Sequence, residues 1–280
     1  DLEKCLHSIW ARTSWDNFEV IVIENNSTDP ETFVYYKEAQ QRYDGLRVVT
    51  YPEKGFNFSG INNFGRNYAT GDYLLLLNND VEVQGADWLT ELLRQCAHPG
   101  GAAICGAELI YPDGTLQHAG VVTGLGGYAG HSHKYRKAGG SGYLFRAATV
   151  QDFSAVTGAC LLVKASVWDE VHGLDEKYAV AFNDVDFCLR VRDAGYRIVW
   201  TPYAQLTHYE SKSRGGDEKD PVKAARFAAE KQRLHDVHGR DNILNDPYYN
   251  PNLTLDREDF SESDDLRNLK EGRVTVRWRE

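Results

Sequence analysis

Three consecutive polar residues, Asn-Asn-Asp at 78–80, are the first candidates for chemistry in this sequence. They follow directly on the apolar run 73–77. A run of this length that is apolar on both faces predicts a strand buried between two layers of helices. Ligands of open α/β sheets bind just beyond the carboxyl ends of such strands. Asp80 is therefore a candidate for the metal or phosphate side of a ligand site, although Asn-Asn-Asp is also good turn chemistry.

Polar groups also follow a second apolar run and open two predicted helices. The run 18–23 stops in the polar cluster 24–29. A glycine-bearing loop at 55–60 precedes a helix, and a helix N-terminus after such a loop is a suitable place for an anion. The stretch 183–186 opens another helix, where acidic side chains cap the first turn and complement the helix dipole. The candidate groups thus lie at strand ends and helix starts.

The elements that must position these groups differ between the two halves of the chain. Residues 1–97 alternate strand and helix, with strands expected at 18–23, 47–50 and 73–77 and helices at 2–12, 31–43 and 85–97. This alternation is typical of a parallel sheet. The second half predicts strands at 103–107, 120–122 and 195–200, a long glycine-rich loop at 124–142, and helices at 165–171 and 222–238. Residues 239–265 are polar and acidic and predict an extended tail, while 273–278 alternate like an edge strand.

Length and composition bound the class of protein. The chain has 280 residues, 42% hydrophobic and 26% charged, which is ordinary for a soluble globular protein. A net charge of −10 argues against a general nucleic-acid surface. No apolar run approaches the roughly 20 residues that span a bilayer. The five scattered cysteines predict free thiols in a reducing compartment. Because the chain lacks Met and opens with Asp1, we expect a fragment of a longer polypeptide.

Four blocks of the sequence, in a fixed order, carry a resemblance to a known family. The blocks are residues 22–29, 55–72, 77–80 and 182–190, and the last is followed by His208-Tyr209-Glu210-Ser211. Together they resemble an inverting glycosyltransferase of family 2, with the GT-A (nucleotide-diphosphosugar transferase) fold, over residues 1–240. Residues 241–280 are then expected to be a C-terminal extension or the start of another module. The segment 117–120, Gln-His-Ala-Gly, is similar to the branch that builds bacterial surface polysaccharides, including rhamnosyltransferase-like members.

The resemblance implies a fold and a set of partners. The expected fold is α/β, with a mostly parallel central sheet flanked by helices and a smaller acceptor-side half. The family's first strand, before helix 2–12, is expected to be absent from this chain. The donor would be a UDP-, dTDP- or GDP-sugar, and the acceptor a glycan or lipid-linked glycan that receives a hexosyl or deoxyhexosyl group. The expected location is the cytoplasm or the inner face of the cell membrane.

The resemblance also assigns donor-side roles. Asp80 and His208 would bind a divalent cation, Mn²⁺ or Mg²⁺, which neutralises the departing diphosphate. Asn78 replaces the first carboxylate of the family's Asp-x-Asp motif, so it can bind only as an amide. The other implied donor-binding residues are Glu24, Asn26, Asn63, Asp72 and Asn79. Alternative roles stay open: His208 as a structural histidine, Asp72 as a turn residue, and residues 24–29 as a solvated helix cap.

On the acceptor side, the resemblance places the general base at Asp184. Inversion by direct displacement needs a base that takes the acceptor's hydroxyl proton from the side opposite the diphosphate. Asn183 replaces the family's usual Glu, and Gly158, Asn183 and Asp186 are the expected acceptor-side residues. The structural alternative is that these acids cap helix 184–194, with Asp186 paired to Arg190 four residues later.

Two other functions remain open from the sequence. Asn78 and Asn183 stand where carboxylates are usual, which favours a degenerate nucleotide-sugar-binding or scaffolding domain as an alternative. A sugar-phosphate nucleotidyltransferase shares a related fold, but it calls for a glycine- and lysine-rich signature near its first strand. We see no such signature in this sequence.

Overall fold

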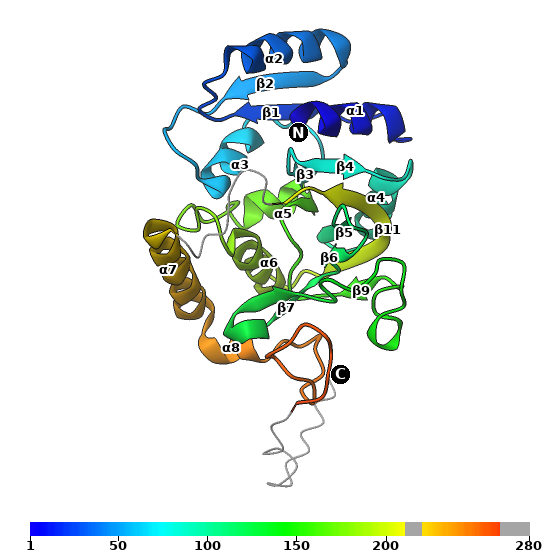
Figure 1. The fold of residues 1–280 in the computed structure, drawn as a ribbon, viewed down its shortest axis with the longest axis vertical. Coiled ribbons are helices and arrows are strands. Elements are labelled where there is room, and N and C mark those ends of the chain that lie inside the picture. The colour runs from blue at the N-terminus through cyan, green and yellow to red at the C-terminus, as the bar shows by residue number, and fades with distance from the viewer. Residues whose placement is uncertain (211–219, 264–280) are drawn as a thin grey trace.

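A computed structural model describes residues 1–210 and 220–263 of the chain, and it is a mixed α/β fold (Figure 1). The helices are α1 (Leu2–Arg12), α2 (Pro30–Arg42), α3 (Phe58–Arg66), α4 (Trp88–Ala97), α5 (Ala165–Glu170), α6 (Asn183–Asp193), α7 (Pro221–His238) and α8 (Arg240–Leu244), with 3-10 turns η1 (Leu125–Gly127) and η2 (Tyr143–Phe145). The strands are β1 (Val20–Glu24), β2 (Leu46–Thr50), β3 (Tyr73–Leu77), β4 (Val81–Val83), β5 (Ile104–Ile110), β6 (Leu116–His118), β7 (Val121–Thr123), β8 (Ala129–His131), β9 (Gln151–Asp152), β10 (Cys160–Lys164) and β11 (Ile198–His208). No helix within the described ranges is both long and apolar enough to cross a membrane.

The larger sheet has the order β3-β10-β5-β11-β4, with β6 paired to β5 and β9 to β11. Within the described part of this sheet, β5 and β11 are the only parallel pair, and the other pairs are antiparallel. The expectation of a mostly parallel central sheet is therefore wrong. The reason is that β10, which returns from the second half of the chain, inserts between β3 and β5 and runs against both.

The first half of the chain does contain the parallel unit that its alternating pattern predicts. β1 and β2 pair in parallel through the crossover helix α2, and they form a separate two-stranded sheet at the top of Figure 1. Its buried core is small, because it consists of Leu6, Ala39, Tyr43 and Leu46. Four of the five residues of β1 are only partly buried, and Glu24 alone is fully buried.

The larger sheet is covered on both faces, and alternate residues of β10 show how. Leu161 and Val163 belong to the cluster that α5 and α6 complete, whereas Cys160 and Leu162 belong to the cluster that α1 and α4 complete. Successive side chains of a strand point to opposite faces, so a strand apolar at every position must be buried on both. The five cysteines are buried free thiols, as the sequence predicts.

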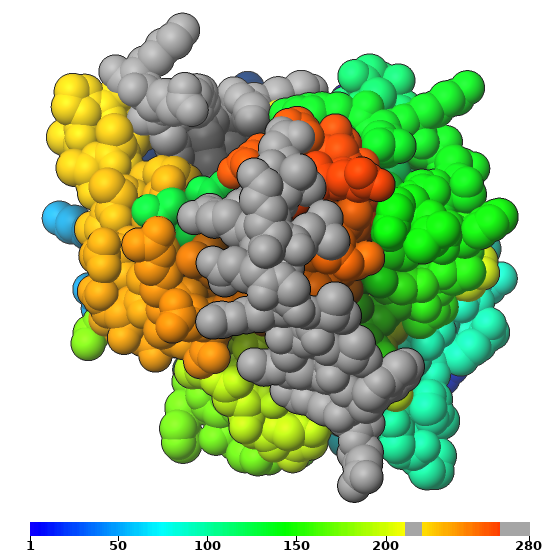
Figure 2. Space-filling view, turned by 90° about the horizontal axis from the view of Figure 1, so that it is seen from below, coloured from blue at the N-terminus to red at the C-terminus, as the bar shows by residue number. Residues whose placement is uncertain are grey.

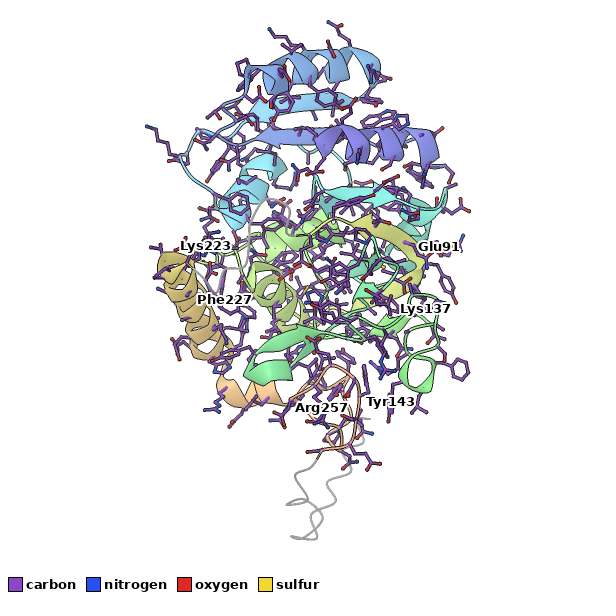
Figure 3. All side chains as sticks on the ribbon, in the orientation of Figure 1. Glu91, Lys137, Tyr143, Lys223, Phe227 and Arg257 are labelled. Carbon is purple, nitrogen blue, oxygen red and sulfur yellow. The ribbon has the colours of Figure 1, made fainter. Side chains whose placement is uncertain are left out.

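The stretch that follows α7 packs on this domain. Ile243, Tyr249, Leu253 and Phe260 join the same buried cluster as α6. Seen from below, the orange segment lies between α7–α8 and the green loops (Figure 2), and Tyr143, whose ring stacks on Phe260, is labelled at this end in Figure 3. The expected extended tail is therefore wrong for residues 240–263, because apolar and aromatic side chains within a polar stretch anchor it. The strand expected at 273–278 lies outside the described residues.

Candidate functional site

Asp80 and His208, 128 positions apart in the sequence, are in contact. The His208 Nε2 atom lies 3.1 Å from Asp80 Oδ1 and 3.3 Å from Asn78 Nδ2. The pairing of β4 with β11 produces this contact, since Val81 is opposite His208 and Tyr209 N donates to Asp80 O. The two residues predicted to flank a cation therefore sit side by side, and His208 is only 5% exposed.

Gln117 lies behind this histidine. Its Oε1 atom is 2.6 Å from His208 Nδ1, and its Nε2 donates to Glu210 Oε2 at 2.8 Å. Glu210 also accepts from the Tyr111 hydroxyl at 3.0 Å. Sequence reasoning used Gln117 only as a mark of one family branch and missed its contact with the site. The available signal was its place beside His118, just before the strand expected at 120–122, and this does not reveal a partner 91 residues away.

The donor set fits a divalent cation that is shared with a ligand. Two ligands that each bind an octahedral cation at about 2.1 Å lie about 3 Å apart when they are adjacent, and the Asp80–His208 distance is 3.1 Å. A carboxylate and an imidazole suit Mn²⁺, and the carboxylate suits Mg²⁺. Among the described residues, no group of three or more His, Cys, Asp or Glu side chains could enclose a metal. The remaining ligands of a cation here would have to be phosphate oxygens and water.

Asp184 opens α6 in surroundings of a different kind. Its Oδ2 accepts from Gly158 N and its Oδ1 from Val185 N, both at 2.8 Å. Burial raises the pKa of this carboxyl above its usual value, while the two backbone hydrogen bonds lower it. Phe182, two residues before Asp184, has a φ of 59°. The chain therefore enters the helix through a residue in the left-handed conformation. A partly buried carboxylate with a raised pKa is suited to accept a proton.

The turn at residues 157–159 joins the two groups. On one side, Gly158 N donates to Asp184, as described above, and on the other, Asn78 N donates to Ala159 O at 3.0 Å. The turn leads directly into β10, where Cys160 is opposite Leu77 in the sheet. Asp184 and the end of β3 therefore border the same turn, which brings together the predicted base and the predicted metal side.

The buried His118 contacts this turn and pairs with the partly buried His131. His118 Nε2 accepts from Thr157 N at 3.4 Å, and the Nδ1 atoms of His118 and His131 are 2.8 Å apart. Burial lowers the pKa of His118 well below its usual value and that of His131 to about 4. Both rings are therefore neutral near pH 7, and they add no positive charge beside the Asp80–His208 pair.

Asp72 does not belong to this group. It precedes β3, whereas Asp80 follows it, so a five-residue strand separates them. Such a strand is about 17 Å long, too far for both carboxylates to meet the same phosphate. Its predicted place among the donor contacts beside Asp80 is wrong, and the turn role that the sequence left open fits its exposed position after Gly71.

Three other residues that were predicted to bind substrate instead form hydrogen bonds or ion pairs with other groups of the protein. Asp186 is 1% exposed, and its two carboxylate oxygens pair with Arg190 at 2.9 Å and His238 at 2.8 Å. Its expected contact with the acceptor is therefore wrong. Asn183 is 4% exposed, donates to Val180 O and accepts from Asp184 N.

Asn63 has the same kind of structural role. It exchanges two hydrogen bonds of 2.9 Å with the backbone of Leu174, which fixes the loop after α5. These bonds occupy its amide, so it does not fit the expected donor contact. Glu24 and Asn26 lie at the end of β1, where Glu24 is 4% exposed and accepts from Ser27 N. Their donor roles, and that of the exposed Asn79, stay predictions.

Comparisons with known proteins give a family match and two longer relatives. The family model for Glycosyl transferase family 2 matches residues 1–146. The uncharacterized protein y4gI of Sinorhizobium fredii is 44% identical over 260 residues, which is 92% of this chain and 28% of that protein. The O-antigen biosynthesis protein RfbC of Myxococcus xanthus is 37% identical over 262 residues, which is 92% of this chain and 20% of that protein. The chain thus spans less than a third of these relatives.

A solved structure supports the fold. The crystal structure of GalNAc-T7 with UDP, GalNAc and Mn²⁺ matches with a TM-score of 0.63 at 12% identity, and the match covers 84% of this chain and 45% of that one. At this identity the likeness concerns the fold alone. It confirms the α/β, GT-A-type class that the sequence resemblance implied.

Proposed function

This chain belongs to glycosyl transferase family 2, and from that premise we propose that it transfers a sugar, with inversion, from a nucleotide-diphosphate sugar to a glycan acceptor. The observation that carries the proposal is that the turn 157–159 hydrogen-bonds Asp184 on one side and, on the other, Asn78, which lies beside the Asp80–His208 pair. In this proposal the leaving-group side and the proton-accepting side adjoin the turn that contains Gly158 and Ala159.

On the donor side, Asp80 and His208 would hold a divalent cation, Mn²⁺ or Mg²⁺. When bound, the cation neutralises the charge that develops on the departing diphosphate. Asn78, 3.3 Å from His208, offers an amide for a ribose or phosphate oxygen. In our proposal Glu24 and Asn26 contribute from the end of β1, and Asn79 from the end of β3.

On the acceptor side, Asp184 takes the proton of the attacking hydroxyl. Its pKa is raised by burial, so the carboxylate holds a proton more strongly than an exposed aspartate does. The two backbone N–H groups that it accepts from fix the orientation of the carboxylate. Gly158 has no side chain to obstruct the acceptor, and the methyl group of an alanine here would come within 3.2 Å of the Phe58 ring.

The substrate classes follow from relatives and neighbours. RfbC is named for O-antigen biosynthesis, and the GalNAc-T7 structure contains UDP and Mn²⁺. We propose a UDP-, dTDP- or GDP-sugar donor, a hexosyl or deoxyhexosyl group, and a growing surface-polysaccharide glycan or lipid-linked glycan as acceptor. The corresponding location is the cytoplasm or the inner face of the membrane, where such donors and acceptors meet.

The test is a donor screen. UDP-, dTDP- and GDP-sugars are incubated with the chain and Mn²⁺, and stabilisation, donor hydrolysis and transfer to glycan acceptors are measured. We expect one donor class to be turned over, with activity lost in Asp80→Ala and retained in Asp193→Ala, a control at an aspartate that is 65% exposed. Binding without turnover across donors and acceptors would favour the scaffold alternative. Release of pyrophosphate from a nucleoside triphosphate and a sugar phosphate would favour the nucleotidyltransferase.

A further inference from the structure

The buried amide of Gln117 connects His208 to a carboxylate outside the candidate site. Gln117 lies on β6, is 3% exposed, and reaches His208 Nδ1 with one end of its amide and Glu210 Oε2 with the other. The distances are 2.6 Å and 2.8 Å, which are those of well-formed hydrogen bonds. The amide has one orientation, because turning it over would place its oxygen against the Glu210 carboxylate oxygen, and neither of these two atoms carries a proton to donate.

The chemistry of these groups determines where the imidazole proton is. The Glu210 carboxylate can only accept, so the NH₂ end of Gln117 must face it. The Oε1 atom must then face His208 Nδ1, and an oxygen acceptor requires a proton on that nitrogen. A neutral His208 with its proton on Nδ1 presents a lone pair on Nε2. Nε2 faces Asn78, whose Nδ2 is 3.3 Å away, and Asp80, whose Oδ1 is 3.1 Å away; without metal the Asp80 carboxylate can accept a proton from Nε2, and a cation bound between the two would displace that proton.

We propose that Gln117 is a positioning residue that holds His208 as the Nδ1–H tautomer, so that Nε2 is ready to bind a divalent cation together with Asp80. The inference rests on the proposed function for the role of the cation, but the tautomer itself is a property of the metal-free chain. Partners that hydrogen-bond the outer nitrogen of a ligating histidine fix its ring and raise its basicity. Their removal costs roughly 10- to 100-fold in metal affinity.

The residue type at position 117 fits this role better than a carboxylate would. A glutamate there could accept from His208, but it would place a second negative charge within hydrogen-bond distance of Glu210. Glutamine accepts toward the histidine and donates toward the glutamate at the same time. The Tyr111 hydroxyl donates to the same Glu210 oxygen, which leaves that carboxylate fixed on the side of the amide.

The first measurement reads the tautomer without metal. In ¹⁵N-histidine-labelled protein, long-range ¹⁵N–¹H spectra distinguish Nδ1–H from Nε2–H rings, and His208→Gln identifies the signal. We expect His208 to be Nδ1–H in the wild type and to become a mixture in Gln117→Leu. The matched control is Gln205→Leu, which removes another glutamine that donates to a buried carboxylate, Glu108, at 2.7 Å. An unchanged His208 tautomer in Gln117→Leu would overturn the proposal.

The second measurement reads metal affinity by Mn²⁺ titration followed by electron paramagnetic resonance. We expect Gln117→Leu to bind Mn²⁺ roughly 10-fold more weakly than the wild type or Gln205→Leu. The double variant Gln117→Glu with Glu210→Gln exchanges the donor and acceptor and should recover most of the affinity and the Nδ1–H tautomer. This variant also carries the test if the leucine variant does not fold, and its failure to show the Nδ1–H tautomer would count against the proposal.

The metal role of His208 and the positioning role of Gln117 can be tested separately. If His208→Ala binds Mn²⁺ as the wild type does, the metal role of His208 is wrong, and so is the purpose assigned to Gln117. If His208→Ala loses Mn²⁺ while Gln117→Leu keeps both the affinity and the tautomer, the site is correct and the positioning role is wrong.

Discussion

Asp80 lies two residues beyond Asn78, which contacts the turn that also holds Asp184, yet the surroundings of the two aspartates prepare them for opposite tasks. Asp80 lies in the turn between β3 and β4 and faces the imidazole of His208. Asp184 starts a helix, accepts two backbone N–H groups, and has a pKa raised by burial. A carboxylate beside an imidazole nitrogen is arranged to share a cation, whereas a buried carboxylate on fixed N–H donors is arranged to take a proton. The comparison teaches that position within an element, rather than residue type, separates the two roles.

The largest expected effect tests the proton-accepting side. Asp184→Asn keeps the shape but removes the base, so we expect kcat to fall by about 10³-fold. Donor binding should stay near the wild-type value, because the Asp80 side is untouched. The measurement is steady-state transfer together with donor titration by calorimetry. A variant that retains full turnover would remove Asp184 from the mechanism and leave the comparison without its second half.

The next largest effect is on the stability of the fold, and it is expected at Asp186, two positions after Asp184. Asp186 is buried and paired with Arg190 and His238. Removing one member of a buried ion pair leaves uncompensated charge, so we expect Asp186→Asn to lower the free energy of unfolding by about 3 kcal/mol. Urea denaturation measures this loss. At a temperature where the variant is folded, its kcat should remain within about twofold of the wild type, and a loss as large as that of Asp184→Asn would contradict the distinction between the two aspartates.

These two aspartates also show how far the sequence could lead. Both lie in the first turn of a predicted helix, and the i, i+4 spacing to Arg190 predicted the structural role of Asp186 correctly as one of two alternatives. The second partner of Asp186, His238, comes from α7, and nothing near Asp186 in the sequence indicates it. Gln117 was missed for the same reason, since its neighbour His208 depends on how β6 and β11 are placed around β5.

The fold, like the site, has parts that the sequence predicts and parts that it does not. The parallel β1–α2–β2 unit was predictable because its pairing is between consecutive strands. The direction of β10, which inserts between β3 and β5, was not, because a strand's own pattern does not specify whether its distant neighbours are parallel or antiparallel. The packing of residues 240–263 was missed because polar composition outweighed a few widely spaced anchors such as Tyr249 and Phe260.

A smaller effect is expected at the turn that joins the two sides. In Gly158→Ala the added methyl would lie 3.2 Å from the Phe58 ring and 3.5 Å from Asp184 Cβ. A small displacement of the base should lower kcat by roughly 10-fold, while Mn²⁺ affinity, set by Asp80 and His208, should not change. Parallel measurements of kcat and Mn²⁺ binding decide this. A variant that loses Mn²⁺ affinity as well would mean that the turn holds both sides as one unit.

The smallest effect concerns the neutral histidines behind the turn, and it appears as a pH dependence of stability. The pKa of His131 is about 4 in the folded chain and 6.5 in its unperturbed state, so between these values the unfolded chain binds more protons. The contribution of this histidine to stability is complete above pH 6.5 and is lost as the pH falls toward 4. By pH 5.5 the loss should be about 1 kcal/mol.

Urea denaturation at pH 7.5 and 5.5 measures this loss. The decrease in the free energy of unfolding should be smaller for His131→Gln than for the wild type, while His7→Gln, at an exposed histidine, should follow the wild type. Because Asp184 is present in all three proteins, its own titration cancels in the comparison. Equal decreases in all three would mean that the pKa of His131 is the same in the folded and unfolded chain, and that this histidine adds a positive charge to the folded protein at pH 5.5.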